Sequence, residues 1–526
     1  MKRNPGKQIL NRLKAAILAL LLSAGCTVRT AGNETVVPAE ETASPSAITE
    51  TIPQEETPRT EPGSDYEDTL NLNEKELALN RYLNTYIKEA DALYNDREVY
   101  GVAGWDKEEA RNSRLYQFCL ALPKGAELHT HEFMFLPFER YIETIRKDAY
   151  IVMEGENEGR VYAANNPARP ENAVLLDDAI SSGRLSMEDL EELLTLSGKE
   201  KKDGLWDTLS KGFVSSGGLF TDNNLITRLF VESFRYAQEI GVDLVEVRIN
   251  RRNKADALAY LEEIRGAYYS VRKEYPDFRV RVIGTSGKNS RYPMESGIET
   301  LRMFMGLSKE FKDEFDPDHP EEFIIGLDLV NEEDKSKPLQ EYLDFLLSDE
   351  VQNSGLKLFL HCGESLRPDN TSVMDAYVVN TYRAGHGFNL YRFPAVMEAY
   401  KEKNITLEIC PISNLSLGYV HDLRLHPAFY YIEQKVPVAV CSDDGLFMTP
   451  YPLVGDYYSA ILCWGLNLRD IRDICERSIK AGGLSEEETE FLAKEWQKKW
   501  DSFVEEELKK AQASESSFSG GQSSAG

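Results

Sequence analysis

The stretch Phe323-Ile324-Ile325-Gly326-Leu327-Asp328-Leu329-Val330 is apolar at almost every position. A strand buried on both faces of a parallel sheet has this continuous pattern, whereas a half-exposed strand alternates apolar and polar residues. Seven further short runs of this kind occur along the chain. The eight runs are Glu127–His131, Asp243–Ile249, Arg279–Gly284, Phe323–Val330, Leu356–His361, Arg383–His386, Ile405–Cys410 and Val436–Cys441. Eight strands that alternate with helices predict an α/β fold, the (β/α)8 TIM barrel.

Helical periodicity fills most of the intervals between these runs. The clearest segments are Asn224–Glu239, Lys254–Glu274, Met294–Phe311 and Leu339–Leu347. The long interval between strands 1 and 2 breaks the alternation, and we expect an inserted helical segment at about residues 133–240. Extra helices are expected at both ends of the barrel, at Glu74–Tyr94 and Asp456–Lys510.

The first 25 residues have the order of a secretory signal peptide. Residues 1–14 contain five basic residues and no acidic residue. An apolar run follows from Ala15 to Leu22, and three small residues precede Cys26. The run is shorter than the roughly 20 residues of a membrane-spanning helix. The small residues resemble a bacterial lipobox, which implies cleavage at residue 25 and a lipid on Cys26 that anchors the protein at the cell surface. A plain signal peptide with an incidental cysteine is the alternative.

Composition separates a stalk and a tail from the folded body, residues 71–513. Residues 26–70 are rich in proline and acids and are predicted to be a disordered acidic stalk. Residues 514–526 are rich in Ser and Gly and are predicted to be a disordered tail. The whole chain has 60 basic and 88 acidic residues and a formal charge of −28. This charge argues against nucleic acid as a partner, and membrane contact is expected only through the N-terminal lipid.

Six cysteines follow Cys26, and no two of them form a CxxC pair. Several lie in or beside apolar runs, where a free buried thiol is the usual state. Disulfides remain an alternative, because spacing alone does not decide the pairing of cysteines.

Four of the seven histidines lie at predicted strand ends, where this fold places its functional groups. They are His129, His131, His361 and His386. His129 and His131 are two residues apart on one strand, so both side chains face the barrel axis. The eighth strand ends in Asp443-Asp444 and lies beside the first strand in a closed barrel. Three histidines and one aspartate suit one Zn²⁺ ion and leave a position for water; iron is possible.

Each of these motifs has a purely structural alternative when it is considered alone. A His-x-His pair can be a hydrogen-bonded core pair, and an Asp-Asp-Gly sequence is often a turn. Glu364, three residues after His361, adds a carboxylate close to a possible ligand. A proton donor or acceptor would occupy such a position.

Five motifs in this order resemble those of the adenosine/AMP deaminase family of metal-dependent amidohydrolases. They are Pro123–His131, His361–Glu364, Gly385–Gly387, Glu408–Asn414 and Ser442–Asp444. The Pro-Lys-Gly opening, the acid after the second histidine and the long insert are most similar to the secreted branch, the adenosine deaminase growth factors. The resemblance implies hydrolytic deamination of a small-molecule purine nucleoside, adenosine or 2′-deoxyadenosine, outside the cell.

The resemblance also implies roles for individual residues. The residues that match the zinc ligands are His129, His131, His361 and Asp443. Glu364 matches the acid that protonates purine N1, and His386 matches the residue that orients and helps to deprotonate the attacking water. Asp444 matches the carboxylate that hydrogen-bonds the water or purine N7.

Two departures from the family pattern concern contacts with the substrate. Asn331 stands where members often have a glycine whose amide faces purine N3. Phe133 stands where compact members have an aspartate for the sugar, and Glu132 precedes it. We expect Glu132, Asn331 and Asp444 to contact the substrate. Deamination of another amino-heterocycle and nucleoside binding without turnover remain alternatives, although the presence of Glu364 and His386 favours an enzyme.

The strand ends show no cluster of bases in sequence. Lys288, Arg291 and Arg383 are interspersed among acids such as Glu132 and Glu364. A phosphate group needs clustered bases or free backbone amides at a helix N-terminus. The sequence therefore predicts that a nucleoside is a better substrate than a nucleotide.

Overall fold

The computed structural model describes residues 67–94, 108–155, 157–196, 205–288 and 292–521. The predicted signal peptide, Cys26 and nearly all of the predicted stalk lie outside these residues. The chain divides into two compact units, of which the first ends at Leu72 and contains the single described turn η1 (Asp68–Leu70). The second unit, Asn73–Gly526, contains all the other described elements.

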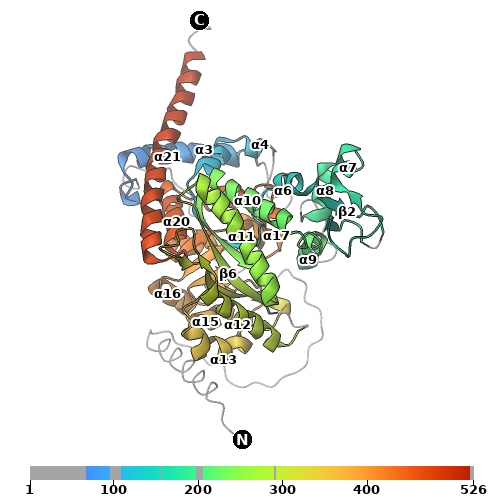
Figure 1. Ribbon diagram of the computed structural model, residues 1–526. Helices are drawn as coiled ribbons and strands as arrows, with labels where there is room; N and C mark the ends of the chain where they lie inside the picture. Colours follow the sequence, from blue (N-terminus) through green and yellow to red (C-terminus); the bar gives the residue numbers. More distant parts are fainter. Residues whose placement is uncertain (1–66, 95–107, 156, 197–204, 289–291, 522–526) are drawn as a thin grey trace, which may run out of the picture. The chain divides into compact units, whose positions relative to one another are not determined.

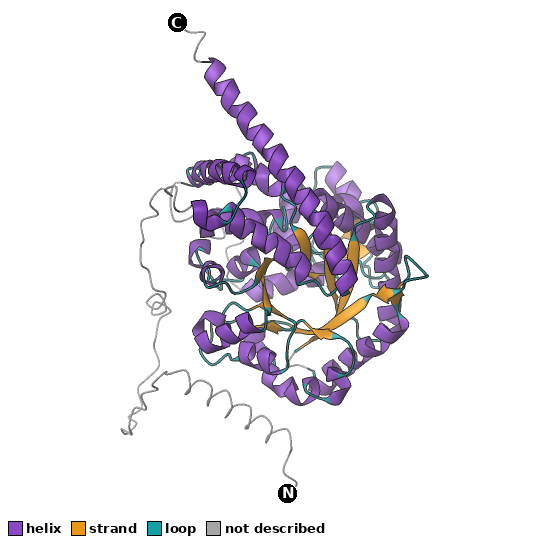
Figure 2. Cartoon of the chain, turned by 90° about the vertical axis from the view of Figure 1, so that its left-hand side faces the viewer, coloured by secondary structure: helices purple, strands orange, loops and turns teal. Residues whose placement is uncertain are grey.

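Parallel strands form the centre of this unit, and helices surround them (Figure 2). One sheet contains, in order, β1 (Gly125–His131), β5 (Val242–Ile249), β6 (Arg279–Gly287), β9 (Ile324–Val330) and β10 (Lys357–Leu358). The other contains β11 (His361–Cys362), β12 (Arg383–His386), β13 (Thr406–Ile409) and β14 (Val438–Val440). The two sheets together contain nine segments, which form eight strands because β10 and β11 are two parts of one strand.

Hydrogen bonds join the two sheets into a ring. The Phe359 N–H, between β10 and β11, donates to the Leu327 carbonyl of β9, and the Gly385 N–H of β12 donates to the Leu360 carbonyl. A parallel bridge between Thr130 and Asp443 links β1 to the end of β14. The barrel predicted from the eight apolar runs is thus confirmed.

Helices cover the outside of the barrel. They are α10 (Asn223–Glu239), α11 (Lys254–Glu274), α12 (Met294–Glu310), α13 (Leu343–Leu346), α14 (Asp349–Gln352), α15 (Ser372–Val378), α16 (Pro394–Glu402), α17 (Pro411–Ser416), α18 (Ala428–Glu433), α19 (Val454–Trp464) and α20 (Leu468–Lys480). Side-chain caps fix several starts; for example, the Asn253 side chain accepts from the Asp256 N–H at the start of α11. Helices α10 and α11 lie side by side against the sheet (Figure 1).

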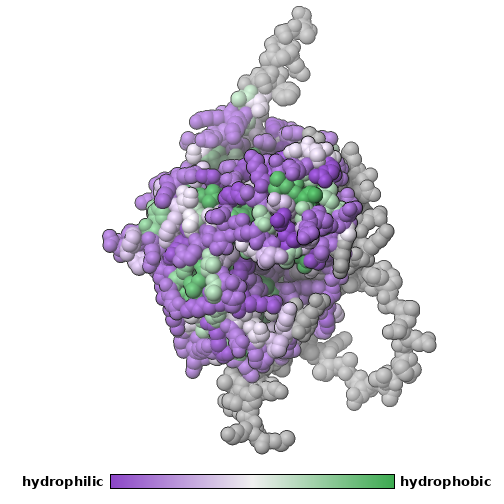
Figure 3. All heavy atoms as spheres, turned by 45° about the vertical axis from the view of Figure 1, so that its right-hand side comes forward, coloured by the Kyte–Doolittle hydropathy of each residue, from purple (hydrophilic) through white to green (hydrophobic). Residues whose placement is uncertain are grey.

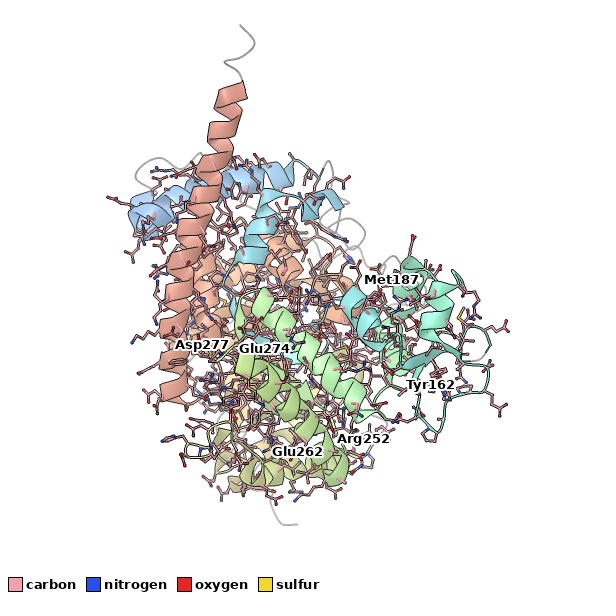
Figure 4. The ribbon with its side chains drawn as sticks, turned by 45° about the horizontal axis from the view of Figure 1, so that its top comes forward. Tyr162, Met187, Arg252, Glu262, Glu274 and Asp277 are labelled. Carbon is pink, nitrogen blue, oxygen red and sulfur yellow. The ribbon has the colours of Figure 1, made fainter. Side chains whose placement is uncertain are left out.

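The insert between β1 and α10 contains helices, as predicted, and also short strands that were not predicted. Its elements are α6 (Phe138–Ile145), β2 (Ala149–Ile151), β3 (Val161–Ala163), β4 (Val174–Leu175), α7 (Leu176–Ser181), α8 (Met187–Leu194) and α9 (Leu205–Ser216). The three strands pair antiparallel in the order β3-β2-β4. Strands of two or three residues are too short to show an alternating pattern. Tyr162 and Met187 mark the insert beside the barrel in Figure 4.

Terminal helices complete the unit. They are α3 (Glu74–Asp91), α4 (Glu108–Arg111), α5 (Arg114–Ala121) and α21 (Glu486–Gly521). The Trp500 indole N–H of α21 donates to Glu76 of α3 at 2.8 Å. Helix α21 continues to Gly521, into the segment from residue 514 that was predicted to be a disordered tail.

Most of the surface visible in Figure 3 is hydrophilic, with smaller apolar areas between the polar residues. No helix within the described residues has the length and apolar character needed to cross a membrane.

Candidate active site

Four predicted ligands converge at the mouth of the barrel. They are His129, His131, His361 and Asp443, and one ligand atom of each lies within 4.8 Å of the others. The Nε2 atoms of His129 and His361 are 3.1 Å apart, and Nε2 of His131 is 3.3 Å from Oδ1 of Asp443. The Asp443 N–H donates to the His129 carbonyl, so the closure of the barrel itself brings the aspartate to the histidines.

Buried carboxylates determine which ring nitrogen carries hydrogen on two of these histidines. Nδ1 of His129 donates to Glu408 at 2.6 Å, and Nδ1 of His361 donates to Asp328 at 2.7 Å. Burial lowers the pKa of His361 to about 4, so this ring is neutral near pH 7. The Nε2 atom of His361 therefore presents a lone pair, and Nε2 of His129 lies 3.1 Å from it beside Asp443.

This arrangement fits a divalent metal ion. Imidazole nitrogens and a carboxylate that converge at such short range can hold a cation between them. Burial alone would raise the pKa of Asp443, but hydrogen bonds from His129 and His131 hold it well below its usual range. Three imidazole nitrogens and one carboxylate oxygen are ligands that Zn²⁺ accepts.

An ionic network beneath the four residues holds their partners in place. Arg248 donates to Asp328 at 2.8 Å and to Glu408 at 2.6 Å. Arg383 donates to Glu408 at 2.6 Å and to Glu246. All five side chains are fully buried. The prediction that Arg383 lies among the bases of the strand ends is wrong, because Arg383 begins β12 and its guanidinium lies inside the barrel.

Glu364, His386 and Asp444 lie beside the ligand cluster. Oε1 of Glu364 is 3.6 Å from Nδ1 of His386. These two atoms and Oδ1 of Asp444 are buried and have no hydrogen-bond partner within the protein. Burial, followed by the charge of Asp443, raises the pKa of Glu364 and of Asp444 well above the usual range. Unpaired buried polar atoms indicate a place for a ligand or water.

The backbone at several of these positions adopts positive φ angles, which favour glycine. The angles are 54° at Glu132, 63° at His386, 57° at Asp443 and 119° at Asn331. Asn331 therefore keeps a backbone angle typical of glycine where other family members often have glycine. Its backbone amide can thus keep the direction that a glycine would give it.

Glu132 forms an ion pair at the rim of the mouth. Its Oε1 accepts from Nη1 of Arg251 at 3.0 Å, while Oε2 and Nη2 of Arg251 are buried without partners. The Arg251 guanidinium lies 3.6 Å from the centre of the Tyr260 ring. Phe133 is fully buried and stacks between Tyr141 and Phe220, so the acid that remains available for a substrate here is Glu132.

Helix α9 of the insert reaches the loops around the mouth, which the sequence did not indicate. The Trp206 indole N–H donates to the Tyr419 hydroxyl at 3.0 Å, beyond β13. The rings of Phe213 and Phe447 are 5.2 Å apart, so α9 also contacts the segment after Asp444. The insert thus contributes to the wall of the candidate site.

A closed (β/α)8 barrel with these histidines and this aspartate defines the chain as a metal-dependent hydrolase of the amidohydrolase type. The chain belongs to the adenosine deaminase family, whose family model, described as "Adenosine deaminase", matches residues 169–499. His361, Glu364, His386, Asp443 and Asp444 lie within the matched residues. The chain is accordingly a hydrolytic deaminase, and the family together with the His/Asp cluster indicates a metal cofactor.

Similar proteins match a larger part of the chain than the family model does. Adenosine deaminase 2 of Dictyostelium discoideum is 25% identical over 463 residues, which cover 82% of this chain and 83% of that protein. Adenosine deaminase 2-A of Danio rerio is 27% identical over 428 residues, covering 75% and 82% of the two chains.

Solved structures share the fold. The N6-mAMP deaminase of Arabidopsis has a TM-score of 0.53 at 20% identity and covers 73% of this chain and 99% of its own. A zinc-bound amidohydrolase of Burkholderia ambifaria has a TM-score of 0.52 at 13% identity and covers 75% and 95%.

Proposed function

We propose that the protein is a zinc-dependent adenosine deaminase that hydrolyses adenosine and 2′-deoxyadenosine to inosine and 2′-deoxyinosine with release of ammonia. One observation carries the proposal beyond the family assignment. The Nε2 atoms of His129 and His361 lie 3.1 Å apart beside Asp443, and unpaired proton-transfer groups adjoin them. A nucleoside-binding protein without turnover would need neither Glu364 nor His386.

The residues that would hold zinc are His129, His131, His361 and Asp443. When bound, zinc supplies Lewis acidity, which lowers the pKa of water from 15.7 to about 7. Glu408 and Asp328 would orient the two histidine rings through Nδ1 and thereby support metal affinity.

The proton-transfer groups account for the rest of the reaction. Glu364 donates a proton to purine N1, which makes C6 electrophilic. His386 accepts a proton from the attacking water, and Asp444 accepts a hydrogen bond from that water or from protonated N7. A C–O bond forms at C6, the C–N bond to the amino group breaks, and the nitrogen leaves as ammonia after protonation. The unpaired atoms of these three side chains support this assignment.

The sugar would lie towards Glu132 and Arg251, and the purine towards Asn331. A carboxylate oxygen and a guanidinium N–H without partners can accept from and donate to sugar hydroxyl groups. The backbone angle of Asn331 allows its amide to approach purine N3 as a glycine amide would.

The bases near the described strand ends do not form a phosphate site. Arg251 is paired with Glu132, and Arg383 lies inside the barrel. Lys288 is fully buried, and its ammonium is 3.4 Å from the His361 carbonyl. We infer that adenosine is a better substrate than AMP, with a charge of −28 further opposing the approach of nucleotides.

The proposed location is the outer surface of a bacterial cell, with a lipid anchor on Cys26. This part of the proposal rests on the order of residues in the first 26 positions, the signal-peptide pattern and the lipobox resemblance. Residues 26–70 would then serve as a stalk between the lipid and the barrel.

Formation of the 6-oxopurine product from a panel of substrates tests the proposed activity. The zinc-loaded protein is compared on adenosine, 2′-deoxyadenosine, AMP, N6-methyl-AMP and adenine at equal low concentrations. We expect the two nucleosides to give the highest kcat/KM. A higher kcat/KM for AMP, for N6-methyl-AMP or for adenine would contradict the substrate assignment.

A further inference from the structure

A second group of metal-binding atoms adjoins the first and shares Asp443 with it. His386, Cys410 and Asp443 each place one ligand atom within 4.8 Å of the others. His386 is the last residue of β12, Cys410 directly precedes α17, and Asp443 is the third residue after β14. Relative exposures of 1%, 0% and 4% show that all three are buried.

We propose that this group binds a second, thiophilic divalent cation, which inhibits the deaminase. The inhibitory part rests on the function proposed above, whereas the binding part does not. The proposed reaction leaves the thiol of Cys410 without a role. The candidate zinc ligands of the first group contain no sulfur, so the two groups differ in chemical softness.

The ligand types favour zinc, cadmium or cobalt. A thiolate, an imidazole and a carboxylate form a borderline to soft set that magnesium and calcium do not prefer. Cys410 binds as a thiolate, so one proton leaves the thiol and passes to solvent for each cation that enters. The thiol now makes only a long contact of 3.6 Å to the Glu408 carbonyl, and a cation would replace this weak hydrogen bond.

His386 contributes one ring nitrogen to this group. Its Nδ1 lies 3.6 Å from Oε1 of Glu364 and has no hydrogen-bond partner. Asp443 has two oxygens for two cations. Oδ1 lies towards His129 and His131, while Oδ2 accepts from the Ser413 hydroxyl at 2.7 Å. A cation at Oδ2 would displace this hydroxyl donor.

Occupancy of the second group would stop turnover for a structural reason. His386 is the group that accepts the proton from the attacking water in the proposed reaction. A cation bound to His386 and Asp443 takes the lone pair of the imidazole and fills the space between the two side chains. Excess metal should therefore inhibit the enzyme that one metal per chain activates.

Cobalt titration tests the binding part directly. Protein that carries one zinc per chain is titrated with Co²⁺, and the thiolate-to-cobalt charge-transfer absorption in the near ultraviolet is followed together with metal content. Since no sulfur belongs to the first group, this absorption reports the second group. We expect one additional cation per chain with the absorption in the wild type and in Cys441→Ser, whose thiol is equally buried on the neighbouring strand. The absorption should be absent in both Cys410→Ser and Cys410→Ala.

Ammonia release during titration with Zn²⁺ tests the inhibitory part. Loss of a supporting group around a metal costs about 10–100-fold in affinity, so loss of a ligand should raise the inhibitory zinc concentration by roughly 100-fold in the Cys410 variants. Absence of the cobalt–thiolate absorption in the wild type, or its persistence in both Cys410 variants, would overturn the second site. Absorption that depends on Cys410 in a protein that releases no ammonia from adenosine would uphold the site and refute the proposed function.

Discussion

Replacement of Glu408 by glutamine removes one negative charge from beneath the candidate site and preserves the size of the side chain. Glu408 accepts from His129 and Arg248, each at 2.6 Å through Oε2, and from Arg383 at 2.6 Å through Oε1. Burial alone would raise the pKa of Glu408, but Arg248 and Arg383 outweigh it and hold this pKa below the usual range. The carboxylate is therefore charged near neutral pH.

The expected cost follows from the burial of the network. Arg248 and Arg383 are fully buried and are balanced by the carboxylates of Asp328, Glu246 and Glu408. Breaking a buried ion pair by removing one partner costs about 3–5 kcal/mol. Because glutamine still offers one acceptor oxygen, we expect the free energy of unfolding to fall by about 3 kcal/mol. Loss of the carboxylate behind His129 should also weaken metal binding by about 10–100-fold.

Urea denaturation of the metal-free proteins measures the first effect, and competition with a chelator measures the second. Glu350→Gln is a matched control, because it removes the same charge from an ion pair with Arg302 that is about half exposed. An exposed pair contributes about 0–1 kcal/mol, so the control should change neither quantity much. Equal unfolding free energies for Glu408→Gln and Glu350→Gln, with equal metal affinity, would refute the role given to the buried network.

Three further outcomes are expected. Asp443→Ala should lower the metal content below one ion per chain, since three ligands make an incomplete site; full occupancy in elemental analysis would exclude Asp443 as a ligand. Glu132→Gln should raise KM for adenosine roughly tenfold or more and change kcat less, because a hydrogen bond to a charged group contributes about 1.5–3 kcal/mol. An unchanged KM would show that Glu132 does not contact the sugar. The wild type should partition into detergent and Cys26→Ala should not, and an unacylated mature N-terminus in mass spectrometry would reject the lipid anchor.

The barrel could be predicted because its strands carry a strong local signal. Strands buried on both faces are continuously apolar, and the histidines and Asp443 interrupt or follow these runs at their ends. Helix α11 was predicted at the same residues that it occupies, Lys254–Glu274, because its amphipathic pattern extends over five turns. The strands β2, β3 and β4 gave no such signal, because each has only two or three residues.

The ionic network could not be predicted, because it depends on contacts between distant parts of the chain. Arg248 and Asp328 are 80 residues apart, and Arg248 and Glu408 are 160 residues apart. The only sequence signal was the presence of charged residues within four of the predicted strands. Such a residue has to find a partner inside the barrel, but the sequence does not indicate which one. The position of α9 beside the mouth could not be predicted either, because it depends on contacts between the insert and distant loops.

Deamination with Glu364 as the general acid is tested by the conversion of adenosine to inosine by the wild type and by Glu364→Gln at equal zinc content. The amide cannot deliver a proton to purine N1, and a general acid contributes about 10²–10⁴-fold to the rate. We predict that the wild type produces inosine and ammonia in equal amounts, and that the variant keeps its zinc but loses kcat by a factor in this range. A variant with near-normal kcat, or a zinc-loaded wild type that leaves adenosine unchanged, would contradict the account.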